Sequence, residues 1–250
     1  MRKSYFHGLI ALVAGLSVAA ACHALMPDQA QPSGAPATPD LSFQNVDAAW
    51  SATPVERGYR FEVRQGDQLP GDMGAESKER SEAYDRMKLA FGQTYEIGFS
   101  LEIAPGAANS AKWMTLAQIQ STFDPGEQGH SPPFGLYMEG EKMVIAARSS
   151  PVEITPPDGF LYIPLYKDKE DIRRGHPYRM KIRVRFDRGG TGAVRVWRDD
   201  RLIASHDGPF GFNDRQGPYF KIGVYRASAP ESYAMTVRDL ALRPTASIDG

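Results

Sequence analysis

Apolar and polar residues alternate along most of the chain between residues 41 and 243. The clearest run covers residues 178–186 (YRMKIRVRF), where apolar side chains fall on one face and arginine or lysine on the other. A repeat of two residues is the spacing of side chains on a half-buried β-strand. Further strands are predicted over residues 59–64, 94–103, 116–122, 134–138, 143–148, 193–197, 201–206, 219–226 and 233–242. The charged segment 75–89 is instead predicted to hold a turn or two of helix.

Glycine, proline and aspartate separate these short segments. The chain has 24 Gly and 19 Pro among 250 residues, more than the roughly 12% that is usual for the two together. Many short strands with turn residues between them predict an all-β fold, a two-sheet antiparallel sandwich or jelly roll. No repeat or Pro/Ser-rich linker divides residues 41–243, which are therefore predicted to form one domain, followed by a tail at 244–250.

Charge and cysteine content exclude several kinds of site. The net charge is −1, from 29 basic and 30 acidic residues, which argues against binding nucleic acid or any other polyanion through bulk charge. A polyanion site must then be a local feature of the surface. The single Cys excludes an internal disulfide framework and multi-cysteine zinc sites.

The first residues read as an export signal. Arg2 and Lys3 precede an apolar run at 9–21 that ends in small residues, the pattern of a secretory signal peptide. The run is shorter than the roughly 20 residues that span a bilayer, so no integral membrane span is expected in the mature protein. We predict a signal peptide at 1–24 and a periplasmic or secreted protein.

The alternative is a lipoprotein anchored through Cys22, which stands where a lipidated cysteine would lie. Lipoprotein signals usually carry Leu three residues earlier, and Ala19 occupies that position, so lipidation is the less favoured outcome. Residues 25–40 are rich in Pro, Ala and small polar residues and are predicted to be a disordered linker.

Three segments place polar or aromatic side chains on one face of an extended strand: ERSEAY at 79–84, LAQIQS at 116–121 and YFKIGVY at 219–225. The side chains on these faces are Arg80, Glu82 and Tyr84 in the first segment, Gln118 and Gln120 in the second, and Tyr219, Lys221, Gly223 and Tyr225 in the third. A concave sheet with such a face can hold a chain-like ligand. Gly223 is expected to let that ligand approach the backbone closely.

The same segments carry a resemblance. RSEAY, QIQ and YFKIGVYR resemble, in this order, three sequence blocks of the jelly-roll polysaccharide lyases. Alginate lyases carry these blocks as R-T/S-E-L, Q-I-H and Y-F-K-A-G-x-Y, and the heparin lyase I-like and glucuronan lyase branches are relatives. The likeness covers about residues 55–242. It implies a concanavalin-like jelly roll with a concave substrate groove, which cleaves a uronate polysaccharide by β-elimination and leaves unsaturated uronyl ends.

The resemblance also implies roles for individual residues. Tyr225 matches the tyrosine that commonly serves as base, acid or both. Arg80 and Gln118 would neutralise the carboxylate, without which the C5 proton is hardly acidic. Lys221 would lower the pKa of Tyr225 by its charge. Substrate-binding roles are expected for Gln120, Glu82, Tyr84, His130, Arg148, Tyr219 and Arg226. The expected partner is an acidic polysaccharide, acted on by a monomer. No metal or other cofactor is required; some relatives hold calcium, but no acidic cluster in this sequence demands it.

One residue departs from the family pattern, because Gln120 stands where the Q-I-H block has His. Gln cannot take a proton. Tyr225 would then act as both base and acid, or His130 would reach the groove from its Gly/Pro-rich loop. A third outcome is a carbohydrate-binding, lectin-like protein without activity. Retained activity is the favoured hypothesis.

Less specific interpretations stand beside these. Arg80 and Glu82 could form a surface ion pair, Gln120 could be a solvated strand position, and His130 an exposed loop residue. A basic stripe on the strand at 178–186 is more simply explained as a solvated convex face than as a polyanion site. Its members are Arg179, Lys181, Arg183 and Arg185. A retaining glycosidase needs two carboxylates about 5 Å apart, and no strand offers the alternating acidic trio that would supply them.

Overall fold

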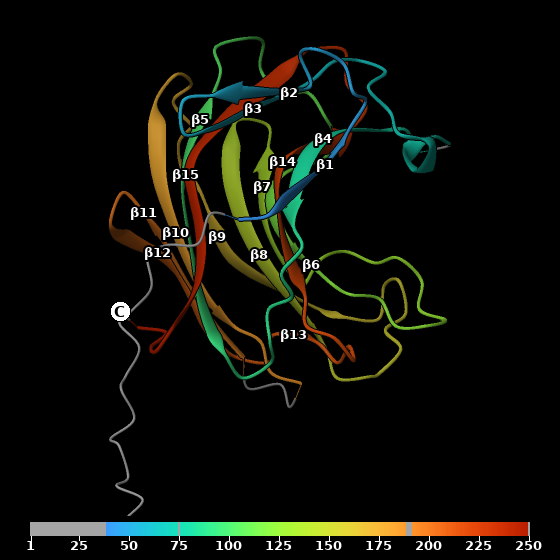
Figure 1. The fold of residues 1–250 in the computed structure, drawn as a ribbon, viewed down its shortest axis with the longest axis vertical. Coiled ribbons are helices and arrows are strands. Elements are labelled where there is room, and N and C mark those ends of the chain that lie inside the picture. Colours follow the sequence, from blue (N-terminus) through green and yellow to red (C-terminus); the bar gives the residue numbers. More distant parts are fainter. Residues whose placement is uncertain (1–38, 75, 189–191, 250) are drawn as a thin grey trace, which may run out of the picture. The chain divides into compact units, whose positions relative to one another are not determined.

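Two curved β-sheets lie face to face in the structure, a computed structural model that describes residues 39–74, 76–188 and 192–249 (Figure 1). These residues fall within one unit, Ala35–Gly250. Among the described residues, neighbouring strands within each sheet pair antiparallel, except that the two-residue β13 pairs in parallel with β8. This is the two-sheet jelly-roll sandwich that the alternating pattern predicts.

The front sheet carries the three segments singled out in the sequence. Its strand order is β1-β4-β14-β6-β7-β8-β13, and β9 pairs with β8. The strands are β1 (Leu41–Asn45), β4 (Lys78–Asp85), β14 (Tyr219–Ala227), β6 (Met114–Gln120), β7 (Phe134–Glu139), β8 (Lys142–Ser150), β13 (Gly211–Phe212) and β9 (Leu161–Lys167). Segments more than a hundred residues apart in the chain, β4 and β14, are therefore direct neighbours.

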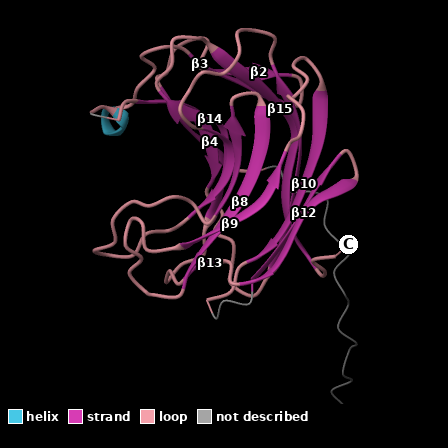
Figure 2. Ribbon diagram, turned by 180° about the vertical axis from the view of Figure 1, so that it is seen from behind, coloured by secondary structure: helices cyan, strands magenta, loops and turns pink. Residues whose placement is uncertain are grey.

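The back sheet has the order β12-β11-β10-β5-β15-β3-β2. Its strands are β12 (Arg201–Gly208), β11 (Gly192–Arg198), β10 (Pro177–Arg185), β5 (Thr94–Ile103), β15 (Tyr233–Thr245), β3 (Gly58–Val63) and β2 (Ala52–Val55). Figure 2 shows β10, β12 and β15 on one side and β4, β8 and β14 on the other.

The core fills the space between the sheets. In β5, Ile97, Phe99, Leu101 and Ile103 are buried while the residues between them are partly exposed. Each fully buried side chain of this kind contributes roughly 1.5–3 kcal/mol. The central strands of the front sheet, such as β6, are buried almost throughout, because loops and polar side chains cover their other face as well.

The basic stripe lies on the outward face of the back sheet. Arg183 pairs with Glu96 at 2.8 Å, Arg179 pairs with Asp200 at 2.6 Å, and the Lys181 ammonium lies 4.3 Å from the Trp197 ring centroid. Neighbouring groups thus engage these charges, as the convex-face interpretation expects.

The helix expected within 75–89 is wrong. Residues 78–85 form strand β4, which is held between β1 and β14 by backbone pairing on both sides, so the sheet overrides the helix propensity of its charged residues. Within the described ranges, the one helix is a 3₁₀ turn at Pro70–Asp72. In that same part of the chain, no helix is long and apolar enough to cross a membrane.

Four strands were not predicted: β1, β2, β9 and β13. β2 and β9 each contain a proline, Pro54 and Pro164, and both lie at sheet edges, where proline is tolerated. The predicted tail at 244–250 begins inside β15, which continues to Thr245. The predicted signal peptide at 1–24, Cys22 and the linker at 25–40, apart from its last two residues, lie outside the described residues.

Candidate active site

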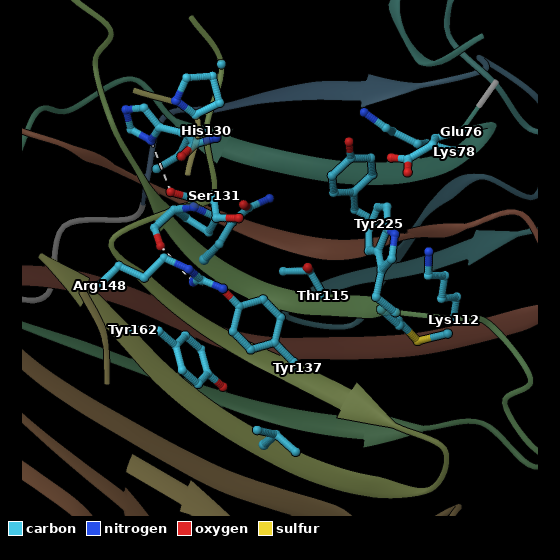
Figure 3. Close-up of a pocket in the computed structure, with 18 of the residues that line it drawn as sticks. Glu76, Lys78, Lys112, Thr115, His130, Ser131, Tyr137, Arg148, Tyr162 and Tyr225 are labelled. Atoms are coloured by element: carbon cyan, nitrogen blue, oxygen red, sulfur yellow. Dashed lines mark hydrogen bonds between the residues drawn. The ribbon is translucent and has the colours of Figure 1, made fainter. Parts of the chain in front are cut away.

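A cavity of about 790 Å³ opens on the outer face of the front sheet (Figure 3). Its floor is formed by side chains of β6, β7, β8 and β14, and residues of the 121–133 and 151–160 loops form part of its wall. Five residues predicted from the sequence line it: Gln118, Gln120, His130, Arg148 and Tyr225.

Strand register brings the three sequence blocks together beside this cavity. Lys221 of β14 lies opposite Tyr84 of β4 on one side and Gln118 of β6 on the other. Two positions further along the same face of β14, Tyr225 lies between Arg80 and Thr115. The four residues predicted to be catalytic, Arg80, Gln118, Lys221 and Tyr225, therefore converge on one face of one sheet.

Glu82 is the centre of this cluster. One carboxylate oxygen, Oε1, accepts a hydrogen bond from Gln118 Nε2 at 2.6 Å. The other, Oε2, lies 2.8 Å from Lys221 Nζ and 3.1 Å from an Arg80 guanidinium nitrogen. The Glu82 side chain is fully buried. Its predicted role as a substrate contact is therefore wrong: Glu82 positions three other residues.

Arg80 is held on several sides. Its Nε and Nη2 donate to the two oxygens of Asp72 at 2.9 and 2.8 Å, and Nη1 donates to Glu82 and, at 3.3 Å, to Gln44. This is no exposed surface pair, because the Arg80 side chain is only 15% exposed. Four of its five N–H groups are engaged within the protein, so little of Arg80 is left to contact a substrate carboxylate.

Tyr225 lies directly against this guanidinium. The Arg80 carbon Cζ is 3.8 Å from the centre of the Tyr225 ring, and Trp113 packs edge-on against the other part of the ring at 4.9 Å. Burial raises the pKa of Tyr225 to about 12; the Arg80 charge opposes that rise, and Asp72 and Glu82 add to it. The phenol is therefore protonated at neutral pH.

Lys221 does not lower the pKa of Tyr225, and that expectation is corrected. The Lys221 residue is 4% exposed, and its ammonium is bound to Glu82. Burial lowers the pKa of Lys221 itself. Lys221 thus supplies a counter-charge for Glu82 within the cluster.

Gly223 has a structural role in place of the expected one. Its φ is +140°, and a Cβ at this position would overlap the carbonyl oxygen of Ser81 on β4. The register between β14 and β6 shifts between Ile222 and Tyr225, which marks a bulge. The neighbouring strand therefore requires glycine at this position.

Tyr84 and Tyr219 form an edge-on pair, with ring centroids 5.9 Å apart, at the Lys221 end of the cluster. The ammonium of Lys88 lies 3.8 Å from the centre of the Tyr219 ring, and burial raises the pKa of Tyr219. Gln120 lies opposite Tyr219 in the register, and its Oε1 accepts a hydrogen bond from the Ser121 N–H at 3.0 Å. The two rings lie beside the cavity, while Gln120 lines it.

His130 lines the cavity from the 121–133 loop but is not an exposed loop residue. Its ring lies edge-on between Phe123 and Phe212, at 4.9 and 4.5 Å, and its side chain is fully covered. Nε2 lies 3.3 Å from Glu127 Oε1, and Nδ1 lies 3.1 Å from the Ser131 carbonyl oxygen. His130 therefore fastens the 121–133 loop at the cavity, and its predicted contact with substrate stays a prediction.

Arg226 is also misassigned. It follows Tyr225 in β14, so its side chain projects from the opposite face of the strand. There it is fully buried and bound to Glu79 at 2.7 Å and to Glu231 at 3.3 Å. It cannot touch a substrate in the cavity.

Tyr137 lines the cavity and was missed by sequence reasoning. It lies on the groove face of β7, opposite Thr115 in the register. Alternation within residues 134–138 could have placed it outward, with Phe134, Leu136 and Met138 toward the core. Figure 3 shows Tyr137 and Tyr225 on either side of Thr115.

Among the described residues, no group of three or more His, Cys, Asp or Glu side chains is arranged to hold a metal ion. The polar groups of the site are instead amide, guanidinium, phenol and ammonium donors around Glu82 and Asp72.

Comparison with known proteins places this geometry in context. The family model described as "Polysaccharide lyase" matches residues 50–239. Among curated protein sequences, none matches this chain significantly.

Solved structures share the fold. An endo-β-1,4-glucuronan lyase from the fungus Trichoderma reesei matches with a TM-score of 0.62 at 13% identity, over 82% of this chain and 88% of its own. The alginate lyase from Corynebacterium sp. matches with a TM-score of 0.55 at 16% identity, over 79% and 82%. Alginate lyase AlgAT5 of polysaccharide lyase family 7 matches with a TM-score of 0.54 at 14% identity, over 80% and 84%. At these identities the likeness establishes the fold.

Proposed function

Because this chain belongs to the polysaccharide lyase family, we propose that it cleaves a uronic-acid-containing polysaccharide by β-elimination. The observation that carries the proposal is the position of Tyr225. Its phenol lies against the Arg80 guanidinium, at the wall of a cavity that Gln118 also lines. A groove with proton-transfer and amide groups on one side suits an anionic chain-like substrate.

The reaction transfers one proton and breaks the C4–O4 bond. The proton on C5 of the uronate leaves, a double bond forms between C4 and C5, and the C4–O4 bond breaks. The departing O4 takes up a proton and becomes the hydroxyl of the other product chain. One fragment therefore carries an unsaturated uronyl end, and no water is consumed.

Tyr225 is proposed to perform both proton transfers, since Gln120 has no basic nitrogen. In its phenolate form it takes the C5 proton, and it then returns that proton to O4 on the same face of the sugar. Burial raises the pKa of Tyr225, and Arg80 opposes that rise by charge and hydrogen bonding, which favours the phenolate. Gln118 uses one amide hydrogen on Glu82, and the second remains for the substrate carboxylate. These groups complete the scheme without a metal, and we expect chelation to leave turnover unchanged.

The test is incubation with alginate, glucuronan and heparin-type polymers, with ultraviolet absorbance of the unsaturated product as the signal. We expect a rise with at least one polymer, and Tyr225→Phe should remove it while leaving polymer affinity nearly unchanged. Tyr84→Phe is the matched control, because it removes a phenol beside the cavity. No product from any uronate polymer would contradict the proposed substrate class. A carbohydrate-binding protein, the alternative raised by Gln120, would bind these polymers and give no absorbance.

We propose in addition that the protein is exported and acts as a monomer outside the cytoplasm, where such polymers occur. The charged and apolar pattern of residues 1–24 supports export. The N-terminal sequence of the mature protein tests this: a start after Ala21 or Ala24 is expected. A lipid on Cys22 would show the anchored alternative instead.

A further inference from the structure

A second group of side chains lines the cavity on β7, β8 and β9, and the proposed proton transfers do not use it. At its centre, Arg148 Nη1 donates hydrogen bonds to Tyr137 Oη at 2.7 Å and to the Pro132 carbonyl at 3.0 Å. The rings of Tyr137, Phe160 and Tyr162 lie 5.4–5.6 Å from its guanidinium carbon. Figure 3 shows Arg148 and Tyr137 meeting beside Tyr162. The guanidinium is therefore fixed in position before any ligand binds.

Arg148 lacks the counter-charge that comparable arginines have. Arg80, Arg198 and Arg226 each lie within 2.9 Å of a carboxylate oxygen. Across the part of the chain that the structure describes, Arg148 forms no ion pair with a carboxylate, and its buried Nε has no hydrogen-bond partner. Glu139, an acid that lines the cavity, pairs with Lys167. A partly buried cation without a counter-charge is costly to maintain, and a bound anion removes that cost.

Tyr137 adds a second donor. Because its oxygen accepts the hydrogen bond from Arg148, its own hydroxyl hydrogen is free to point elsewhere. Burial raises the pKa of Tyr137, so this hydroxyl stays protonated and can donate. Hydrogen bonds in series polarise one another, which makes the Tyr137 hydroxyl a better donor toward an anion.

The backbone of β7 leaves room for the Tyr137 ring at Gly135. A Cβ at Gly135, two residues before Tyr137 on the same face of β7, would overlap the Tyr137 ring. The ring occupies the space that any larger residue at 135 would need. The position of the Tyr137 hydroxyl is thus built into the strand.

We propose that Arg148 and Tyr137 form a subsite for a carboxylate of the polysaccharide, on a uronate next to the one cleaved at Tyr225. This rests on the proposed function. Tyr225 and Tyr137 occupy one row of the sheet, on strands separated by β6, and two strand spacings are about 10 Å. One carboxylate cannot contact both Tyr225 and Tyr137. The enzyme therefore recognises the carboxylates of two neighbouring sugars.

Binding measurements test the subsite apart from catalysis. In a Tyr225→Phe background, Arg148→Met should weaken calorimetric binding of a uronate oligosaccharide roughly 10- to 100-fold, as expected for charge-assisted hydrogen bonds. For the matching oligosaccharide with its carboxyl groups reduced to alcohols, the same substitution should change the binding affinity less than about twofold. Tyr137→Phe should weaken uronate binding by roughly 3- to 10-fold, the value of one hydrogen bond.

Arg215→Met is the control variant, since it also removes one positive charge but lies on the exposed surface, paired with Glu153. It should leave both affinities unchanged. Equal weakening for the uronate and reduced oligosaccharides, in an Arg148→Met protein that unfolds at the normal temperature, would show that Arg148 only supports the cavity wall and would overturn the subsite. Unchanged binding of the uronate oligosaccharide by the Arg148→Met protein would also overturn the subsite. These outcomes are separate from the proposed function, which fails only if the native chain releases no unsaturated product.

Discussion

The phenol of Tyr225 carries the proton that the proposed elimination must move. Its pKa is raised to about 12, by burial first and by two nearby carboxylates. A group with such a pKa is a ready acid at neutral pH, but it acts as a base only in the small fraction of molecules that have lost the proton.

Activity should therefore rise with pH. If Tyr225 must be ionised to take the C5 proton, kcat/KM increases about tenfold per pH unit between roughly pH 7 and 10, because the phenolate fraction grows tenfold per unit below the pKa. Initial rates of product absorbance across this range, at constant ionic strength, give the slope. A flat profile would mean that Tyr225 donates a proton and that another group removes the one on C5.

Glu82 holds the cluster together, since its carboxylate contacts Arg80, Gln118 and Lys221. Glu82→Gln leaves the buried Lys221 ammonium without a carboxylate partner. Loss of one partner from a buried ion pair costs about 3–5 kcal/mol, and chemical denaturation should show a loss of this size together with reduced turnover.

The double variant Glu82→Gln, Lys221→Met supplies the control. It removes the stranded cation as well, so it should recover part of the lost stability but not the turnover. A single variant as stable as the parent would show that water screens this cluster, which would contradict its buried character.

At the scale of the strand, the bulge in β14 depends on Gly223. Gly223→Ala adds a Cβ at φ +140°, where it meets the β4 backbone. We expect a loss of more than about 2 kcal/mol in unfolding free energy, together with lower turnover because Tyr225 moves. Gly98→Ala in β5 is the matched control, because nothing lies within 4 Å of its Cβ and its φ is ordinary. That variant should be neutral or slightly stabilised.

Strands were predictable where one face meets the core and the other meets water. β5 was predicted to the residue and β10 to within one residue, because both alternate cleanly. β4 was less clear: its charges suggested helix, yet those charges pair with residues distant in sequence, such as Gln44 and Lys221. Local pattern cannot show contacts of that kind.

The site was predictable only in part, for a related reason. The three sequence blocks identified the strand faces that meet, and so gave Arg80, Gln118 and Tyr225. No sequence pattern indicated that Asp72, on a 3₁₀ turn, would accept hydrogen bonds from two of the five Arg80 N–H groups. The burial of His130 likewise depends on Phe123, in a loop, and on Phe212, in strand β13.

At the scale of the whole molecule, stability should depend on pH through Asp214. Burial, and then the nearby Glu127 and Asp124 carboxylates, raise its pKa from 3.8 to about 7. Between these two values the folded chain keeps a proton that the unfolded chain has released, so the free energy of unfolding falls as pH rises and levels off above about pH 7. The effect amounts to roughly 2–4 kcal/mol.

Asp214→Asn should flatten that part of the curve of unfolding free energy against pH, and should be more stable than the parent at about pH 8. Asp200→Asn is the control, because that carboxylate is exposed beside Arg179, and its curve should follow the parent's. Parallel curves for Asp214→Asn and the parent would show that this carboxyl titrates normally.

Strand β1 has a practical consequence for the design of recombinant domains. It precedes the residues that the family match covers, 50–239, yet it pairs with β4 along its whole length, and Gln44 from it contacts Arg80. The last strand, β15, likewise continues past the match to Thr245. A protein cut at the family boundaries would uncover the edge of β4 and invite aggregation through it. An expression boundary should therefore lie before Leu41 and after Thr245.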